Sequence, residues 1–368
     1  MEPDPDRPED LGKLRERIDA VDNHLLGLLN ERADLVHEVG LIKKRDGLQI
    51  YAPEREEALL QRLVKASQAM GGRLPEVSVR AIYREIMSAA LALEEDLQIA
   101  YLGPEGTWTH QAAIAKFGHS VHYAPQDSFE EVFDTVSRRR ADYGVVPIEN
   151  STEGAVNHTL DLFADSPLSI CAQILLRIEN ALMARIPREQ IRRIYSHPQV
   201  FGQCRQWLSR HFPKAELIPV SSTTKAAAIA AVEPDSAALG GSLAAQLNGL
   251  QILEESIQDS ATNTTRFLVI SEKTCPPTGN DRTSIMFAVK DRPGSLYDAL
   301  RPFNELAVNM SKIESRPSKR RAWEYFFFVD ILGHVDDAAV RDALDKLEMH
   351  CSMIKVLGSY PNTGPCEA

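Results

Sequence analysis

Several features that mark other classes of protein are missing from this chain of 368 residues. It has no run of eighteen apolar residues, and residues 1–10 are acidic and rich in proline, so we expect neither a membrane span nor a secretion signal. Its five cysteines are widely scattered, with no CxxC pair and no histidine at zinc-site spacing. The sequence therefore predicts a protein of the reducing cytoplasm that has no structural metal.

Positive charge is also in short supply. The chain has 41 Lys and Arg against 52 Asp and Glu, a formal net charge of -11, which argues against nucleic acid as a partner. With 43% hydrophobic and 25% charged residues, the composition is that of an ordinary soluble globular protein with room for two or three domains. A site for a small acidic ligand would therefore need several cations gathered close together.

Residues 11–45 form the most distinctive stretch. Apolar side chains recur there at steps of three and four residues, which predicts one long helix with an apolar face. Arg15, Arg32 and Lys43 lie on the same rows. A cation on a buried face is costly unless an anion meets it, although for a single residue the commoner outcome is a side chain that reaches solvent at the rim of a bundle. Because there are three, we favour an anion site.

Helix geometry constrains that site. Lys43 comes eleven residues after Arg32, about 16 Å along the axis and on nearly the same face, so both side chains can lean toward one small ligand. Arg15 is seventeen residues before Arg32, about 25 Å away, and cannot reach the same ligand. A helix of about 50 Å is longer than a lone small domain can cover. We therefore expect a partner chain, with Arg15 completing the partner's pocket.

The rest of the chain divides into three regions. Two further helices, from residue 53 to the glycines at 71–72 and over about 75–97, complete an all-helical unit of about a hundred residues. Strands and helices then alternate, and the predicted strands are 99–102, 143–146, 194–196, 217–220, 236–239 and 266–270. From residue 281 a βαββαβ order predicts a ferredoxin-like unit.

Polar turns that can cap helices follow most strands of the middle region. They lie at residues 103–107, 147–154, 196–199, 221–224 and 240–242. In open α/β sheets, ligands settle at the carboxyl ends of strands, where helix N-termini present free N–H groups. Each turn alone is more simply an ordinary helix cap, but the set predicts a cleft for an anionic small molecule.

Together these pieces resemble a known family, the bifunctional chorismate mutases/prephenate dehydratases of phenylalanine biosynthesis. The mutase motifs are RERID at 15–19, NER at 30–32, GLIK at 40–43 and PERE at 53–56. The dehydratase motifs are GPEGT at 103–107, VPIENS at 146–151, SHPQ at 196–199 and NTTRF at 263–267. GSLY at 294–297 and ESRP at 314–317 resemble the regulatory ACT domain.

The resemblance implies a multidomain fold. Residues 1–98 would be an all-α mutase domain that forms an intertwined dimer. Residues 99–275 would be an α/β, two-lobed dehydratase domain like a periplasmic binding protein, and residues 283–361 an α+β, ferredoxin-like ACT domain. The implied activities are the Claisen rearrangement of chorismate to prephenate and the decarboxylating dehydration of prephenate to phenylpyruvate, inhibited by phenylalanine. No metal or organic cofactor is implied, and the expected assembly is a homodimer or a higher homo-oligomer.

For the mutase, the resemblance implies catalytic roles for Arg32, Lys43 and Glu94. The implied substrate-binding residues are Arg15, Arg32, Lys43, Ala52, Arg55, Glu56, Ala90 and Glu94. The family pattern has an aspartate, a serine and a glutamine at the positions of Ala52, Ala90 and Glu94. A glutamate can donate a hydrogen bond to the ether oxygen only when protonated, which burial would favour. Alternatively, Glu94 pairs with one of the arginines and stays ionised.

For the dehydratase, the family assigns the key role to a threonine that matches Thr265, which would polarise the leaving hydroxyl or relay a proton. The implied substrate-binding residues are Thr107, Glu149, Asn150, Ser151, Ser196, Gln203, Arg266 and Phe267. The turn at 222–224 is a further candidate. His197 could be a catalytic acid, but a histidine before proline in a tight turn is more often structural.

For the ACT domain, the helix that begins near Gly294 can meet the carboxylate of a free amino acid. The implied effector-binding residues are Gly294, Ser295, Leu296, Asn309, Glu314, Ser315 and Arg316. Two other interpretations stay open. The helical unit could be a degenerate mutase that serves only for dimerisation beside an active dehydratase, or the whole chain could be a non-enzymatic amino-acid sensor.

Overall fold

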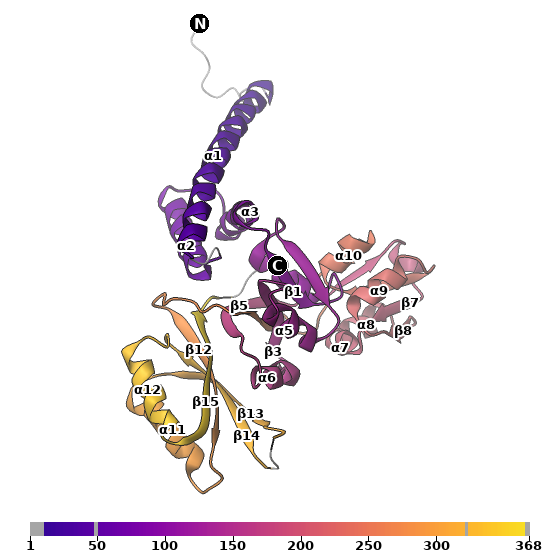
Figure 1. The fold of residues 1–368 in the computed structure, drawn as a ribbon. Coiled ribbons are helices and arrows are strands. Elements are labelled where there is room, and N and C mark those ends of the chain that lie inside the picture. Colours follow the sequence, from indigo (N-terminus) through magenta and orange to yellow (C-terminus); the bar gives the residue numbers. More distant parts are fainter. Residues whose placement is uncertain (1–10, 48–50, 321–322, 365–368) are drawn as a thin grey trace.

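The computed structural model describes residues 11–47, 51–320 and 323–364, in three regions that follow one another along the chain (Figure 1). The first region is helical and consists of α1 (Leu11–Asp46), α2 (Pro53–Ala69) and α3 (Glu76–Glu94). The predicted helix over residues 11–45 is confirmed. Pro53 lies at the first position of α2, where its missing N–H costs no helical hydrogen bond.

The long helix α1 projects from the rest of the molecule (Figure 1). Ile18, Val21 and Leu25 are 57%, 58% and 50% exposed, although they form its apolar face. Gly40, near the other end, is buried against α3, and a Cβ there would lie 3.0 Å from Cγ of Glu94. The rest of the described chain therefore covers only the C-terminal part of α1.

The middle region contains two mixed sheets. The first lobe has the strand order β2-β1-β3-β11-β5, with β4 paired to β3. Its elements are β1 (Gln98–Leu102), α4 (Trp108–Phe117), β2 (His122–Gln126), α5 (Phe129–Ser137), β3 (Tyr143–Asn150), β4 (Gly154–Ala155), α6 (Asn157–Phe163), β5 (Ser169–Arg177) and β11 (Thr264–Ser271).

The second lobe has the strand order β10-β6-β9-β7-β8. Its elements are β6 (Ala181–Ala184), the 3-10 helix η1 (Arg188–Gln190), β7 (Arg193–Ser196), α7 (Pro198–Gln203), α8 (Arg205–His211), β8 (Glu216–Pro219), α9 (Thr223–Ala230), β9 (Ser236–Gly240), α10 (Ser242–Asn248) and β10 (Gln251–Glu254). The chain enters this lobe after β5 and returns at β11, so two connections join the lobes. This arrangement confirms the predicted two-lobed α/β organisation.

Polar turns from the two lobes meet. Gly106 lies just before α4 in the first lobe, and a Cβ there would lie 3.3 Å from Oγ1 of Thr224 in α9. Across the same junction, a Cβ at Gly241 would lie 3.0 Å from the ring of Trp108. The turns after β1, β8 and β9 therefore lie at one junction between the lobes.

The C-terminal region has the predicted βαββαβ order, with a sheet in the order β13-β14-β12-β15. Its elements are β12 (Asp281–Val289), α11 (Ser295–Glu305), β13 (Met310–Pro317), β14 (Tyr325–Leu332), α12 (Ala338–Glu348) and β15 (Cys351–Pro361). Helices α11 and α12 cover one face of the sheet. The other face packs on the first lobe, where Met286, Phe328 and Tyr360 share a core with Ile148 and Ile170.

Gly358 is the closest point of this contact. Its φ is +149°, and a Cβ there would lie 2.2 Å from the carbonyl oxygen of Ile170 in β5. The backbone at Gly358 and the carbonyl oxygen of Ile170 can separate only if a strand moves, because β15 and β5 are both paired within their own sheets. A side chain at this position would therefore push the C-terminal sheet away from the first lobe.

We expect Gly358→Ala to destabilise the protein by about 2–4 kcal/mol, because it adds overpacking to backbone strain. Thermal unfolding followed by circular dichroism would measure the shift. The matched control is Gly202→Ala in α7, where nothing lies within 4 Å of an added Cβ. If the two variants unfolded at the same temperature, the packing argument at Gly358 would be wrong.

Candidate functional site

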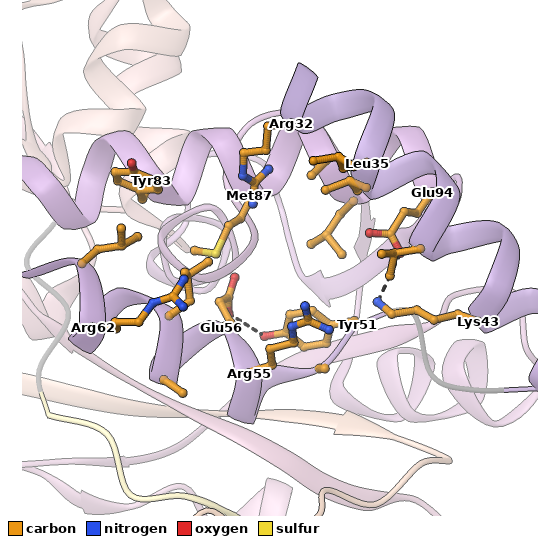
Figure 2. A pocket seen from close by; sticks show the side chains of 18 residues that line it. Arg32, Leu35, Lys43, Tyr51, Arg55, Glu56, Arg62, Tyr83, Met87 and Glu94 are labelled. Atoms are coloured by element: carbon orange, nitrogen blue, oxygen red, sulfur yellow. Dashed lines mark hydrogen bonds and ion pairs between the residues drawn. The ribbon is translucent and has the colours of Figure 1, made fainter. Parts of the chain in front are cut away.

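A cavity of about 790 Å³ lies between α1, α2 and α3 (Figure 2). Four cations line it, Arg32 and Lys43 from α1 and Arg55 and Arg62 from α2. Most of the remaining wall is apolar and is formed by Leu35, Val36, Val39, Ala52, Ala58, Leu59, Leu63, Met87, Ala90 and Leu91. A small dianion in this cavity would meet several cations in largely apolar surroundings.

Glu94 and Lys43, which both line the cavity, are in contact. Oε2 of Glu94 lies 3.2 Å from Nζ of Lys43, and the two side chains are 7% and 15% exposed. The absence of a side chain at Gly40 lets Glu94 approach α1 this closely. Glu94 thus forms an ion pair, with a lysine rather than one of the arginines considered above.

Glu56 has two partners at the edge of the cavity. Its Oε2 accepts a hydrogen bond from the hydroxyl of Tyr51 at 3.4 Å (Figure 2) and pairs with Nζ of Lys116 at 2.8 Å. Burial, and to a lesser extent Glu56, raises the pKa of Tyr51 well above its usual value, so this hydroxyl keeps its proton. Lys116 belongs to α4 of the first lobe, so a residue outside the helical region contacts the cavity wall.

The cavity includes the predicted mutase residues with one exception. Arg15 lies on the exposed part of α1 and does not line it. The cavity also contains Arg62 and Tyr51, which the sequence analysis missed. Arg62 could have been found, because it follows Arg55 by seven residues and therefore lies on the same helix face. No spacing rule indicates Tyr51, which lies in a connecting segment.

In the first lobe, Asn150 at the end of β3 contacts Thr265 on β11. Nδ2 of Asn150 donates to Oγ1 of Thr265 and to Oδ1 of Asn263, both at 2.8 Å. Its Oδ1 accepts from the backbone N–H and the hydroxyl of Thr152 and from the N–H of Glu153. These bonds fix the amide. Since Oγ1 of Thr265 is the acceptor in its bond to Asn150, the hydroxyl proton of Thr265 is left to donate elsewhere.

Two more predicted dehydratase residues lie close to this pair. Gln203 from α7 in the second lobe donates to Glu153 at 3.3 Å and accepts from Asn180 at 3.2 Å. Ser151 donates to the carbonyl of Thr262 and accepts from the N–H of Thr264, which ties the end of β3 to β11. Asn263 is a residue that the sequence analysis left out of the site. It is buried, and its Nδ2 has no hydrogen-bond partner in the described part of the chain.

The side chains of Glu149 and Arg266 face the opposite side of the sheet from those of Asn150 and Thr265. They are paired across β3 and β11, one position from the Asn150 and Thr265 pair, and successive strand residues face opposite sides. Arg266 is buried and pairs with Asp330 at 2.6 Å, and Glu149 pairs with Lys312. The structure therefore groups these two residues with the C-terminal region, and not with Thr265 as the sequence analysis did.

Other predicted residues serve the fold. Thr107 caps α4 by accepting from the N–H of His110, and buried Ser196 donates to the carbonyl of Leu239. Phe267 is part of the core of the first lobe. His197 accepts from the N–H of Gln199 at the start of α7, as expected for a structural histidine.

The predicted effector residues divide between the two faces of the C-terminal sheet. Gly294 and Ser295 begin α11, and Leu296 packs into the core under the helices. The side chain of Arg316 lies on the opposite face and pairs with Asp161 of α6 at 3.0 Å. Glu314 shares that face, since it lies two residues from Arg316 along β13, and Ser315 between them faces the helices. Asn309, just before β13, accepts through its carbonyl from the N–H of Leu332.

Within residues 11–47, 51–320 and 323–364, no three His, Cys, Asp or Glu side chains gather in a way that could hold a metal ion. None of the helices in that part of the chain is long and apolar enough to cross a membrane.

Comparison with known proteins identifies the three regions. Family models match residues 14–95 (chorismate mutase type II), 99–275 (prephenate dehydratase) and 283–348 (ACT domain). The bifunctional chorismate mutase/prephenate dehydratase of Aquifex aeolicus (strain VF5) is 46% identical over 355 residues, which is 96% of this chain and 98% of that protein. The chain belongs to this family.

A second bifunctional chorismate mutase/prephenate dehydratase, from Pseudomonas aeruginosa, is 42% identical over 360 residues, covering 96% of this chain and 98% of its own. Among solved structures, the prephenate dehydratase of Arthrobacter aurescens in complex with L-Phe is similar over 72% of this chain and 90% of its own, with a TM-score of 0.68 and 35% identity. The family therefore gives this chain chorismate mutase and prephenate dehydratase activities together with an ACT domain.

The ion pair between Glu94 and Lys43 makes a test of Glu94 possible. Glutamine donates a hydrogen bond at any pH, whereas a glutamate must first be protonated. In its ion pair with Lys43, Glu94 accepts a hydrogen bond and does not donate one, so we expect Glu94→Gln to raise the mutase activity. The gain should be about a hundredfold, the scale of one oxyanion-hole donor.

Chorismate loss, followed by absorbance at neutral pH, measures both activities. Asp96→Asn, which neutralises an exposed carboxylate two residues further along, is the control and should leave the activity unchanged. Equal activity in Glu94→Gln and the unmodified protein would mean that the side chain of Glu94 has no part in the reaction.

Proposed function

We propose that the cavity in the helical region is the chorismate mutase site and that Asn150 and Thr265 form the centre of the prephenate dehydratase site. The corresponding domains are residues 1–98 and 99–275, followed by an ACT domain over 283–361, in a cytoplasmic protein. The observation that carries the first assignment is the cavity itself, because Arg32, Lys43 and Arg55 converge there in largely apolar surroundings.

The cavity suits the mutase reaction. The rearrangement of chorismate is unimolecular and needs no covalent step, and negative charge grows on the ether oxygen in the transition state. Cations and donors held in a dry site stabilise that charge, each by about 3–4 kcal/mol if it acts like an oxyanion-hole donor. Arg32 and Arg55 would hold the carboxylates, and Lys43 would leave Glu94 in part to meet the ether oxygen. The apolar wall would keep the substrate folded in its reactive shape.

A second copy of the chain would complete this site. The apolar face of α1 is exposed beyond the reach of α2 and α3, as expected of a helix that packs against another protomer. Arg15 lies on that part of α1, about 25 Å along the axis from Arg32. We propose that Arg15 enters the cavity of the partner in a homodimer or a higher homo-oligomer.

Co-expression of Arg15→Ala and Arg32→Ala chains tests the shared site. Neither variant alone should have more than a trace of mutase activity, but a mixed dimer has one intact site. With random pairing, half the dimers are mixed, so the activity should recover to about a quarter of the unmodified level.

The control is a mixture of Arg32→Ala and Lys43→Ala chains. Both residues belong to the same cavity of one chain, so no mixed dimer has an intact site and no recovery is expected. Equal activity in the two mixtures would argue against a site shared between protomers.

For dehydration, the support comes from the hydrogen bonds of Thr265. Its Oγ1 accepts from Asn150, so its proton is oriented away from Asn150 and can be donated to the ring hydroxyl that leaves prephenate. Ser151 and Gln203 support the ends of the strands around it. Loss of the carboxylate completes the aromatic ring, which drives the reaction. Thr265 would act as a donor to the leaving group and not as a nucleophile.

We expect Thr265→Ala to lower prephenate dehydratase activity at least about a hundredfold, because one positioned donor is lost. Chorismate mutase activity should be unchanged. Formation of phenylpyruvate and loss of chorismate measure the two reactions in the same sample. The control is Thr262→Ala, an exposed threonine three residues away. Full dehydratase activity in Thr265→Ala would remove Thr265 from the reaction.

The effector is proposed to be phenylalanine. The structure of the Arthrobacter aurescens prephenate dehydratase contains L-Phe. In this chain, the N-terminus of α11 at Gly294 and Ser295 can receive its carboxylate. Strand β13 is at the edge of its sheet, where the ACT domain of another protomer could pair with it.

A further inference from the structure

The wall of the mutase cavity includes a charge from outside the helical region. Nζ of Lys116, near the end of α4, lies 2.8 Å from Oε2 of Glu56 on α2, and the two side chains are 12% and 10% exposed. Lys116 falls within the part of the chain that matches prephenate dehydratase, whereas Glu56 lines the mutase cavity. A dehydratase residue therefore forms a nearly buried ion pair with a mutase residue.

Tyr51 reinforces the pair. It is 2% exposed, and its hydroxyl donates to the same Oε2 atom of Glu56. Its ring lies 5.7 Å from Nζ of Lys116, and 5.0 and 5.1 Å from the rings of Phe117 and Tyr143 in the first lobe. Tyr51 thus reaches the cavity from one side and the core of the first lobe from the other.

Further contacts hold α4 in place against α3. The N–H of Ser120 donates to Oγ of Ser88 at 3.0 Å, and His119 contacts Glu85 at 2.9 Å. A Cβ at Gly118 would lie 2.4 Å from Cβ of Ser88, so the chain passes α3 as closely as glycine allows. The position of Lys116 relative to the cavity is therefore defined by packing on two sides.

Glu56 is an anion in a cavity that needs its cations for a doubly charged substrate. Arg55 precedes it, and Arg62 lies on the same wall. Without a fixed cation of its own, the Glu56 carboxylate would turn toward one of these arginines and compete with the carboxylates of the substrate. Both contacts of Glu56 among the described residues use Oε2, so Oε1 stays available to the substrate while Lys116 holds the other oxygen.

We propose that Lys116 is a positioning residue for the chorismate mutase reaction, so that the dehydratase domain completes the mutase site of the same chain. This inference rests on the proposed mutase cavity. Lys116 does not touch the substrate. It holds Glu56 in one orientation and keeps that carboxylate from neutralising Arg55 or Arg62.

The test uses the full chain with Lys116→Met, which keeps most of the length of the side chain but not its charge. We expect KM for chorismate to rise about tenfold and kcat to change by less than about twofold, because substrate must displace Glu56 from a cation. The kinetics with prephenate should be unchanged, which also shows that the protein has folded. Lys116→Arg, which keeps the charge, should restore most of the affinity. Lys65→Met, at an exposed lysine of α2, is the control.

Combining Lys116→Met with Glu56→Gln distinguishes a role of Lys116 in positioning Glu56 from a purely structural role. If Lys116 acts through Glu56, Lys116→Met should raise KM by less than about twofold when Glu56→Gln is already present. The same rise in both backgrounds, or an unchanged KM in Lys116→Met alone, would overturn the inference. Should Lys116→Met lose dehydratase activity, Lys116→Gln serves the same comparison.

Different variants test the proposed cavity and the proposed role of Lys116. If Glu56→Gln and Arg55→Ala both left chorismate kinetics unchanged, the proposed cavity itself would be wrong. If those variants were impaired while Lys116→Met behaved like the unmodified protein, the cavity would stand and the role of Lys116 would fall.

Discussion

Two of the buried charge pairs in the described part of the chain link neighbouring regions, and together they join all three. Glu56 of the helical region meets Lys116 of the first lobe, and Arg266 of the first lobe meets Asp330 of the C-terminal sheet. Breaking such a pair leaves an uncompensated buried charge, at a cost of about 3–5 kcal/mol. Charge pairs therefore help apolar packing to hold the regions together. Both neighbouring regions contact the dehydratase domain.

Helix geometry made the mutase cavity predictable. The spacing between Arg32 and Lys43 fixes both on one face of α1, so these two cations could be assigned from helix geometry. Arg55 was assigned only because the PERE motif resembles that of the family. The contributions of Tyr51 and Lys116 could not be assigned, because they depend on how the first lobe docks on the helices. The charge pair of Glu94 was considered from the sequence, but its partner proved to be Lys43, which Gly40 brings within reach.

The strands show where prediction from motifs falls short. Glu149 and Arg266 are adjacent in sequence to Asn150 and Thr265, so the family motifs placed all four at one site. Alternation along β3 and β11 sends the first pair to the opposite face. That period of two follows from the strand conformation alone. Strand β5 was missed for a different reason, because a short apolar run such as residues 169–177 fits a buried strand or a buried helix equally well.

Because of the same alternation, two adjacent residues of β11 make contacts on opposite sides of the sheet. Thr265 faces Asn150 in the first lobe, and Arg266 reaches Asp330 and Tyr360 beneath the C-terminal sheet. Helix α4 makes a comparable link on the other side of the lobe, since it begins at the junction of the lobes and carries Lys116 about 12 Å further along its axis. A helix and a paired strand move as rigid units. Strand β11 therefore links the C-terminal sheet to Thr265, and helix α4 links the junction of the lobes to the wall of the mutase cavity.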